Sequence, residues 1–410
     1  MFRELNSLRS LRPLTLLAAL ALSAVVSLAS ADASDLSLPA QVGKMMFFDR
    51  NLSASGKMAC STCHDPNFAY APPNDLAVQL GGPNVNVAWT RAVPSLRYKD
   101  VTPAYSDLFD NPDGISAPGP GGGFTQDGRA PTLADQAQIP LLAANEMANA
   151  SYADVVAKIQ RSAYASLFQQ TFGDAVFDNT QKAFAFAMKA LQAYQLEDVS
   201  FHPYTSKYDL YAANKIGGDL TASEARGLAV FSDPDKGNCF ACHYSGAGQN
   251  GSVALFTDFS FAAIGVPRNT RDIPANTMVR GLPGSYDLGI CSRPDHPVAS
   301  NAQYCGMFKT PTLRNVATRK VFFHNGQFKQ LTDVLHFYNT RDTHPELWYP
   351  AVNGVVQKFD DLPTKYRGNI DTQMPLDGRP RGSQPAMTEQ DITDLLAFLG
   401  TLNDGYQPNK

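Results

Sequence analysis

The chain contains 410 residues, of which 44% are hydrophobic and 18% are charged, and its formal net charge is −4 at pH 7. This slightly acidic balance, with no basic stripe and no interleaving of aromatic and basic residues, argues against a nucleic-acid-binding protein. Beyond the N-terminus no apolar stretch approaches the length that crosses a bilayer, and the length of the chain favours two domains.

The first 31 residues have the three parts of a secretory signal peptide. Arg3, Arg9 and Arg12 supply a basic start, residues 14–28 are almost wholly apolar, and residues 29–31 read Ala-Ser-Ala. We predict a signal peptide at residues 1–31 that is cleaved on export to the periplasm; an uncleaved anchor is the alternative. Cleavage would remove three Arg and one Glu and leave a soluble chain of formal charge −6, with no membrane span.

Helical periodicity dominates the next part of the chain, and strand signals are scarce. An apolar helix that contains residues 46–48 precedes Cys60, and a loop rich in Pro and Gly occupies residues 112–123. Helical spacing of apolar residues returns at residues 155–168 and 184–191.

The second half repeats the order of the first. An apolar helix that contains residues 230–231 precedes Cys239. Near the C-terminus, Thr388 and Glu389 open a helix whose apolar stripe runs from Ile392 to Leu402.

Two segments, Cys60–His64 and Cys239–His243, match the pattern C-x-x-C-H. Two thiols one helical turn apart can add to the two vinyl groups on one edge of a porphyrin, and the adjacent imidazole then binds the iron. A zinc site would need four thiol or imidazole ligands close together, and a redox dithiol would need a βαβ setting. The sequence has neither. It therefore predicts two covalently bound haem c groups, held by Cys60, Cys63 and His64 and by Cys239, Cys242 and His243.

The two motifs lie in halves that read as one internal duplication. We predict an all-α fold of two cytochrome-c-like domains in tandem, each enclosing one covalently bound haem, with long irregular loops. The N-terminal domain would cover residues 32–210 and the C-terminal domain residues 211–410. Long loops are acceptable here because a large cofactor supplies core that the chain does not.

Cys291 and Cys305 have no adjacent histidine and no C-x-x-C spacing. In an oxidising compartment they are expected to form a disulfide, and two free buried thiols are the alternative.

The ligand on the side of each iron opposite its histidine decides what a haem can do. No histidine lies between His64 and His202, so the first haem has no obvious sixth ligand. The simplest interpretation is an open iron that can bind peroxide.

Three groups of residues then give the chain a family resemblance. The first is residues 43–49 with Leu52 and Ser53; the second is residues 127–130 with Leu133, Gln136, Pro140, Glu146 and Met147; the third is residues 308–315, 324–326 and 338–339. Over essentially its whole mature length the chain resembles the bacterial dihaem cytochrome c peroxidase and MauG superfamily.

The resemblance implies roles for residues at the first haem. Glu146 matches the family's distal acid, which would take a proton from bound peroxide and return it to the leaving oxygen. Gln136 and Pro140 would line the same pocket. Taken without the resemblance, Glu146 reads as an ordinary solvated helix residue.

The resemblance also implies a distal ligand for the second haem. Tyr338, fourteen residues after His324, stands where ordinary peroxidases of the family have Met and MauG-like members have Tyr. A phenolate is a hard anionic ligand that lowers the potential of the iron, whereas a thioether raises it. Met307 is the rival ligand, and Tyr338 as a core aromatic is the other interpretation.

The chain departs from the family pattern at the two positions that control electron flow. A histidine that leaves the first haem on reductive activation is replaced by Asn84, seven residues before Arg91. This implies reaction with peroxide in the resting ferric state. The Trp between the haems is replaced by Gln126, so electrons must take another route or tunnel directly.

Two further departures concern calcium and a protein substrate. Positions that resemble the inter-haem calcium site are Ala92, Arg319 and Val321, and an Arg guanidinium can supply the charge of the ion. Calcium is therefore not expected, although Arg319 on the surface is the alternative. The surface Trp that MauG uses is replaced by Gly237, which argues against a MauG-type maturase.

The leading hypothesis is a periplasmic dihaem peroxidase that reduces hydrogen peroxide to water through high-valent haem states, without reductive activation. Its electrons would come from a small periplasmic c-type cytochrome or a cupredoxin. The second hypothesis is a MauG-like enzyme that oxidatively modifies a partner protein, and the third is a non-catalytic electron-transfer cytochrome. The resemblance also allows a homodimer.

Overall fold

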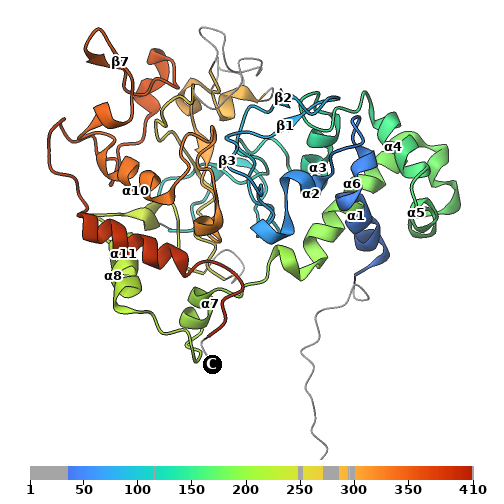
Figure 1. Cartoon of the computed structure of the whole chain (residues 1–410), viewed down its shortest axis with the longest axis horizontal. Coiled ribbons are helices and arrows are strands. Elements are labelled where there is room, and N and C mark those ends of the chain that lie inside the picture. Colours follow the sequence, from blue (N-terminus) through green and yellow to red (C-terminus); the bar gives the residue numbers. More distant parts are fainter. Residues whose placement is uncertain are drawn as a thin grey trace, which may run out of the picture. The chain divides into compact units, whose positions relative to one another are not determined.

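The computed structural model describes residues 36–114, 116–247, 253–270, 286–293, 295 and 301–408. The predicted signal peptide at residues 1–31 lies outside the described residues. Within these ranges the fold is mostly helical, as predicted, with long loops and short strands (Figure 1). The helices are α1 (Leu38–Phe48), α2 (Cys60–Cys63), α3 (Leu133–Leu142), α4 (Tyr152–Gln160), α5 (Ala165–Phe172), α6 (Thr180–Glu197), α7 (Lys207–Ala212), α8 (Ala222–Ser232), α10 (Leu331–Thr340) and α11 (Glu389–Gly400). Among the described residues, no helix has the length and apolar character that a membrane span requires.

Helices α1 and α6 cross tightly in the first half of the chain (Figure 1). Gly43 of α1 lies at the crossing, where a Cβ atom would be 1.9 Å from the carbonyl oxygen of Ala190. Because glycine has no side chain, the two backbones approach, and Met46 and Phe47 are buried in the cluster that contains Tyr194. This crossing fixes the helix that leads to the first C-x-x-C-H motif.

Helices α8 and α11 make the corresponding crossing in the second half. A Cβ atom at Gly227 of α8 would be 2.0 Å from the carbonyl oxygen of Asp394. Thr388 caps α11, because its hydroxyl accepts the N–H of Asp391 while the Asp391 carboxylate accepts the N–H of Thr388. The predicted C-terminal helix therefore begins where its residues indicated, at Glu389.

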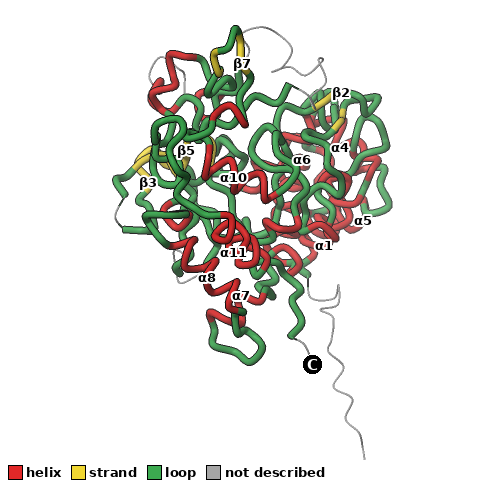
Figure 2. Tube along the Cα trace, turned by 60° about the vertical axis from the view of Figure 1, so that its left-hand side comes forward, coloured by secondary structure: helices red, strands yellow, loops and turns green. Residues whose placement is uncertain are grey.

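The loops carry strands that the all-α prediction did not include. Four antiparallel pairs join β1 (Leu80–Gly81) to β2 (Val87–Ala88), β3 (Ser106–Phe109) to β4 (Gly119–Gly121), β5 (Phe261–Ala262) to β6 (Phe308–Lys309), and β7 (Ala351–Val352) to β8 (Val355–Val356) (Figure 2). Strand β4 lies in the predicted loop at residues 112–123. It forms because Gly121 leaves room for the ring of Phe109, which a Cβ atom there would approach to 2.2 Å.

Two large hydrophobic clusters fill the interior. The first is built from residues between Val42 and Phe201, and the second from residues between Tyr208 and Leu402. The predicted boundary at residue 210 lies two residues beyond Tyr208, the first member of the second cluster, while Leu36–Lys410 forms one compact unit. The division into two tandem domains stays a proposal.

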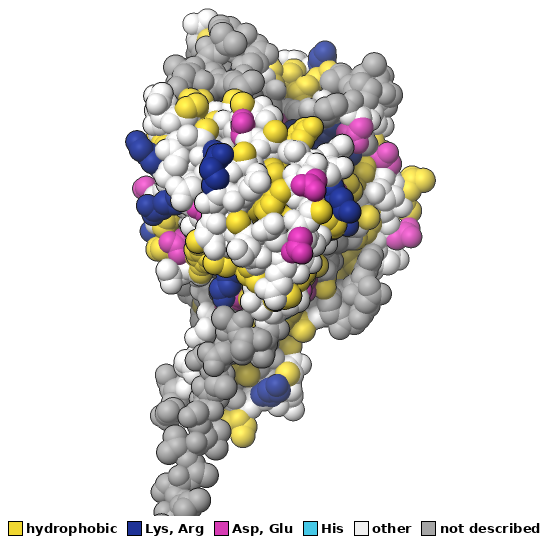
Figure 3. Space-filling view, turned by 90° about the vertical axis from the view of Figure 1, so that its right-hand side faces the viewer, with side chains coloured by type: hydrophobic (Ala, Val, Ile, Leu, Met, Phe, Trp, Pro, Cys, Tyr) yellow, Lys and Arg dark blue, Asp and Glu magenta, His cyan; other side chains and the backbone are white. Residues whose placement is uncertain are grey.

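Charged side chains of both signs are interspersed on the face that lies to the right in Figure 1. Figure 3 shows Lys and Arg side chains alternating with Asp and Glu side chains there, with hydrophobic side chains between them. This face therefore presents no single-sign field that would attract a strongly charged partner.

Cys291 and Cys305 form the predicted disulfide, fourteen residues apart in the sequence. Replacing both with Ala should lower the free energy of unfolding by about 3 kcal/mol, because the unfolded chain gains the entropy of an open loop. Urea unfolding of the two proteins, both loaded with haem, measures the difference. Equal unfolding midpoints would show that the crosslink contributes nothing to stability.

Candidate functional site

The first C-x-x-C-H motif forms one turn of helix, α2, with His64 directly after it. The His64 N–H donates to the carbonyl of Cys60 at 2.9 Å, so the thiols and the imidazole belong to one compact turn. Nδ1 of His64 lies 3.0 Å from the carbonyl oxygen of Tyr70. Because a carbonyl only accepts, Nδ1 carries the proton and Nε2 is left for a metal. Burial lowers the pKa of His64 to about 4, which keeps the imidazole neutral.

The second motif repeats this arrangement. The turn at Cys239–Ala241 is followed by Cys242 and His243, whose N–H donates to the carbonyl of Cys239 at 2.7 Å. Nδ1 of His243 donates to the carbonyl of Phe256 at 3.0 Å, and burial lowers the pKa of the imidazole. Both histidines therefore present a neutral Nε2, which is the state in which histidine binds iron.

A cavity of about 410 Å³ opens beside the first motif. Its lining includes all the residues predicted to attach the first haem or to form the peroxide pocket: Cys60, Cys63, His64, Gln136, Pro140 and Glu146. Apolar side chains such as Phe47, Leu96 and Leu133 form much of the rest of the wall. A flat, largely apolar macrocycle attached to the two thiols fits this donor set and this lining.

Glu146 follows α3 and is held in the cavity by its backbone. Its carbonyl accepts the N–H of Gly82 at 2.7 Å, and a Cβ atom at Gly81 would lie 2.6 Å from its Cα atom. No described residue donates a hydrogen bond to its carboxyl group, and burial raises the pKa of that group to about 8. A carboxyl group in this state can both release and accept a proton near neutral pH.

Gln136 and Pro140 lie four residues apart on α3 and line the same cavity. Pro140 is inside the helix and has no N–H, so the carbonyl of Gln136 lacks the usual helical donor. The structure thus brings all three predicted residues of the peroxide pocket into one cavity with His64.

At the second motif, Tyr338 on α10 lies near both thiols. Burial, followed by the nearby Cys242 and Cys239, raises the pKa of Tyr338 well above its ordinary value. Tyr338 packs against the large cluster of the second half, which Cys239 also joins. The rival residue Met307 packs instead against a separate cluster around the Cys291–Cys305 disulfide.

The positions that depart from the family pattern have distinct surroundings. Asn84 is exposed in the turn between β1 and β2. Gln126 lines the cavity, and its Nε2 donates to the carbonyl of Ala92 at 2.9 Å. Its Oε1 is buried and has no hydrogen-bond partner in the part of the chain that the structure describes. A Cβ atom at Gly237 would lie 2.5 Å from the carbonyl oxygen of Val230.

Arg319 is half-buried rather than exposed on the surface, and its charge acts on His64. Its guanidinium donates to the carbonyl of Val93 at 3.0 Å. Among the described residues, no three His, Cys, Asp or Glu side chains are grouped so that they could hold a metal ion.

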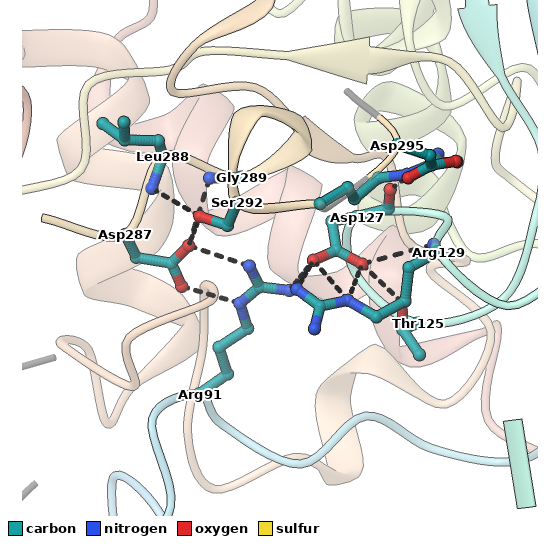
Figure 4. Close-up of polar contacts among 10 residues, drawn as sticks. Arg91, Thr125, Asp127, Arg129, Asp287, Leu288, Gly289, Ser292 and Asp295 are labelled. Atoms are coloured by element: carbon teal, nitrogen blue, oxygen red, sulfur yellow. Dashed lines mark hydrogen bonds and ion pairs between the residues drawn. The ribbon is translucent and has the colours of Figure 1, made fainter. Parts of the chain in front are cut away.

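The sequence did not point to Asp287, which closes one wall of the cavity. Figure 4 shows Arg91 between two carboxylates: its Nε and Nη2 donate to Asp287 at 2.6 and 2.8 Å, and its Nη1 donates to Asp127 at 2.7 Å. Asp127 also binds Arg129 and the hydroxyl of Thr125. Burial alone would raise the pKa of Asp127, but the charges of Arg91 and Arg129 hold that pKa well below its usual range.

This cluster joins segments far apart in the sequence. Arg91, Arg129 and Asp287 all line the cavity, and Asp287 comes four residues before Cys291 of the disulfide. The wall of the first haem site is therefore completed by the second half of the chain.

Comparison with known proteins places this geometry in a family. Residues 39–216 match the family model of dihaem cytochrome c peroxidases. The chain is 34% identical over 385 residues to the methylamine utilization protein MauG of Paracoccus denitrificans, which covers 90% of this chain and 89% of that protein. It is 26% identical over 295 residues to the cytochrome c551 peroxidase of Nitrosomonas europaea, which covers 70% of this chain and 68% of that protein.

A solved structure extends the similarity to three dimensions. The crystal structure of the diheme peroxidase BthA from Burkholderia thailandensis is 39% identical and superposes with a TM-score of 0.78, covering 91% of this chain and 87% of that chain. Sequence and fold thus agree over about nine-tenths of the chain. The chain belongs to the dihaem cytochrome c peroxidase and MauG family, and it is an oxidoreductase that carries two haem c groups.

Proposed function

We propose that this chain reduces hydrogen peroxide to water at the haem attached to Cys60 and Cys63, without reductive activation. The observation that carries the proposal is the isolated carboxyl group of Glu146, which lines the same cavity as His64 and both thiols. Cys60, Cys63 and His64 would hold the haem, which would bind peroxide and pass on the electrons that peroxide reduction requires. The reaction consumes one peroxide, two electrons and two protons and gives two waters.

The protein's own residues manage the protons. Glu146 takes the proton from one oxygen of peroxide and delivers it to the other, which then leaves as water. Gln136 and Pro140 shape the space beside Glu146, and the apolar wall limits competing water. His64 binds the iron through Nε2, oriented by its Nδ1 donation to Tyr70. Tyr338, which lies near Cys239 and Cys242, would serve with His243 in holding the second haem.

The absence of reductive activation has a direct test. We expect the ferric protein to react with peroxide within the mixing time of a stopped-flow instrument, because Asn84 is no haem ligand. The same protein, half reduced beforehand, serves as the control. If only the pre-reduced protein reacted, the first haem would be closed at rest and the proposal of an open site would be wrong.

The rate of peroxide cleavage should depend on pH through Glu146. Burial raises the pKa of Glu146 to about 8, and the carboxyl group must lose its proton before it accepts one from peroxide. Well below pH 8 the second-order rate should therefore rise about tenfold per pH unit, and above this pKa it should level off. Stopped-flow measurements from pH 5.5 to 9.5 test the profile. A rate that falls as pH rises would contradict the role of base.

The second candidate function is oxidative modification of a partner protein, as the 34% identity to a methylamine utilization protein MauG suggests. The position of Tyr338 beside the second thiol pair favours it, and Gly237 in place of a tryptophan opposes it. Incubation of the holoenzyme with peroxide and periplasmic extract separates the two functions. A stable mass change in one extract protein supports modification, whereas turnover with a reduced small cytochrome or cupredoxin alone supports the peroxidase.

We also propose export to the periplasm, where such donors are found. The proposal rests on the signal-peptide pattern of residues 1–31 and on haem c attachment. Calcium is not included, because Arg319 donates to the Val93 carbonyl at a position that resembles the family's calcium site.

A further inference from the structure

We propose that Lys99, Lys309 and Arg319 bind the propionate groups of the haem attached at Cys60 and Cys63. The three residues are called the cationic cluster below. The inference rests on haem attachment at this site, which is part of the proposed function, but not on peroxide as the substrate.

The cluster is drawn from three separate segments that meet at one wall. Lys99 and Lys309 line the cavity, and Arg319 donates to the carbonyl of Val93, which also lines it. Hydrogen bonds link these segments, because the N–H of Lys309 donates to the carbonyl of Gln126 at 2.8 Å and Gln126 Nε2 donates to the carbonyl of Ala92. The wall beside Arg319 is thus tied to the wall beside Lys309.

No described carboxylate is bound to the cluster. Arg319 donates to the Val93 carbonyl and the Lys309 ammonium donates to the Gly123 carbonyl, while no described residue accepts a hydrogen bond from the Lys99 ammonium. Asp127, the acidic group that acts on Lys309, is already bound by two arginines. The three side chains are half-buried, and cations withdrawn from water are costly unless an anion accompanies them.

The pKa values of the two lysines show that the cluster lacks a neutralising anion. Burial, followed by the charge of Arg319, lowers the pKa of Lys99 to about 8, and burial, followed by the charge of Lys99, lowers the pKa of Lys309 to about 7. The other basic residues of the wall, Arg91 and Arg129, have carboxylate partners. The excess positive charge is therefore confined to the cluster.

Different charged groups act on the thiols and on the histidine of the first motif. Glu146 is the charged residue that acts on Cys60 and Cys63. The charges of Arg319 and Lys99 act instead on His64, and the charge of Arg319 also acts on Lys99. In haem c the thioethers lie on one edge of the porphyrin and the two propionates on the opposite edge. The proposal therefore requires the cluster to lie across the cavity from the thiols, and no member of the cluster is among the groups that act on Cys60 and Cys63.

This assignment gives the cluster two effects. First, cations that neutralise the propionate charges favour the reduced haem, so the cluster would raise the reduction potential of the first haem. Lys99 comes from the first half of the chain, and Lys309 and Arg319 come from the second. Bound propionates would therefore hold the two halves together.

The test uses the holoenzyme with both haems and the variants Lys99→Met and Arg319→Met. Lys320→Met is the matched control, because Lys320 is adjacent to Arg319, exposed, and donates to the carbonyl of Pro73. Resonance Raman spectra report the propionate bending bands, and a redox titration reports the potential of each haem. We expect shifted bands and a lower potential of the first haem in both variants, neither change in the control, and recovery in Lys99→Arg.

Several outcomes would decide the matter. Bands and potentials that match those of the control in both Lys99→Met and Arg319→Met would overturn the assignment. If either variant failed to retain its haem or its fold, Lys309→Met and the charge-preserving Lys309→Arg would be compared in its place by the same criterion. Shifted bands in a protein that does not cleave peroxide would support the cluster and reject the proposed function.

Discussion

Replacing Glu146 with Gln should slow peroxide cleavage by roughly 100-fold or more, which is the range lost when general acid-base help is removed. Gln has almost the same size as Glu but cannot carry a proton between the two oxygens. The surrounding backbone, held by the Gly82 N–H and by the close approach of Gly81, should not move. Stopped-flow mixing of the ferric holoenzyme with peroxide measures the rate.

The control for this prediction is Glu389→Gln. The Glu389 side chain is 83% exposed at the start of α11, so the same change of charge there should leave the rate unaltered. The Glu146 variant should also lose the rise of rate with pH, because no other described group in the cavity has a pKa near 8 and an unpaired carboxyl. A rate near that of the unchanged protein would remove Glu146 from the mechanism.

The parts of this site that are local in sequence could be predicted from the sequence. The two C-x-x-C-H turns are local, and so are the capped helix at Glu389 and the apolar helices before each motif. Glu146 became a candidate only through resemblance, because an isolated Glu beside Met147 has no local signature of burial. Its carboxyl group is buried because the segment that follows α3 packs against Gly81, which is a tertiary contact.

The long-range parts of the site could not be predicted. Asp287 and Arg91 are separated by 196 residues, and neither lies in a pattern that pairs it with the other. Lys99 in the sequence resembles any exposed lysine, since its burial depends on a cavity built by both halves. The sequence shows Gln126 at the position where the family has a Trp, but it does not predict the hydrogen bonds that join Gln126 to Ala92 and Lys309.

Replacing Tyr338 with Met should raise the reduction potential of the second haem by on the order of 0.1 V or more, since axial ligands set haem potentials over about 0.8 V. A phenolate stabilises ferric iron as a hard anion, whereas a neutral thioether stabilises ferrous iron. Burial, followed by Cys242 and Cys239, raises the pKa of Tyr338, so the phenol remains neutral unless a cation such as iron binds it. A redox titration followed at the Soret band measures the shift.

Met307→Leu separates this prediction from its rival. Met307 packs against the disulfide cluster, while Tyr338 packs with the aromatic rings of Phe323 and Phe337 in the cluster that includes Cys239. If Tyr338 is the ligand, Met307→Leu leaves the potential and spectrum of the second haem unchanged, and Tyr338→Phe opens its sixth position and gives a high-spin signal. If Met307→Leu instead produces the high-spin signal, the second haem has a thioether ligand and functions as an ordinary high-potential donor. The potential of the second haem would then favour simple electron delivery to the first haem over storage of oxidising equivalents beside Tyr338.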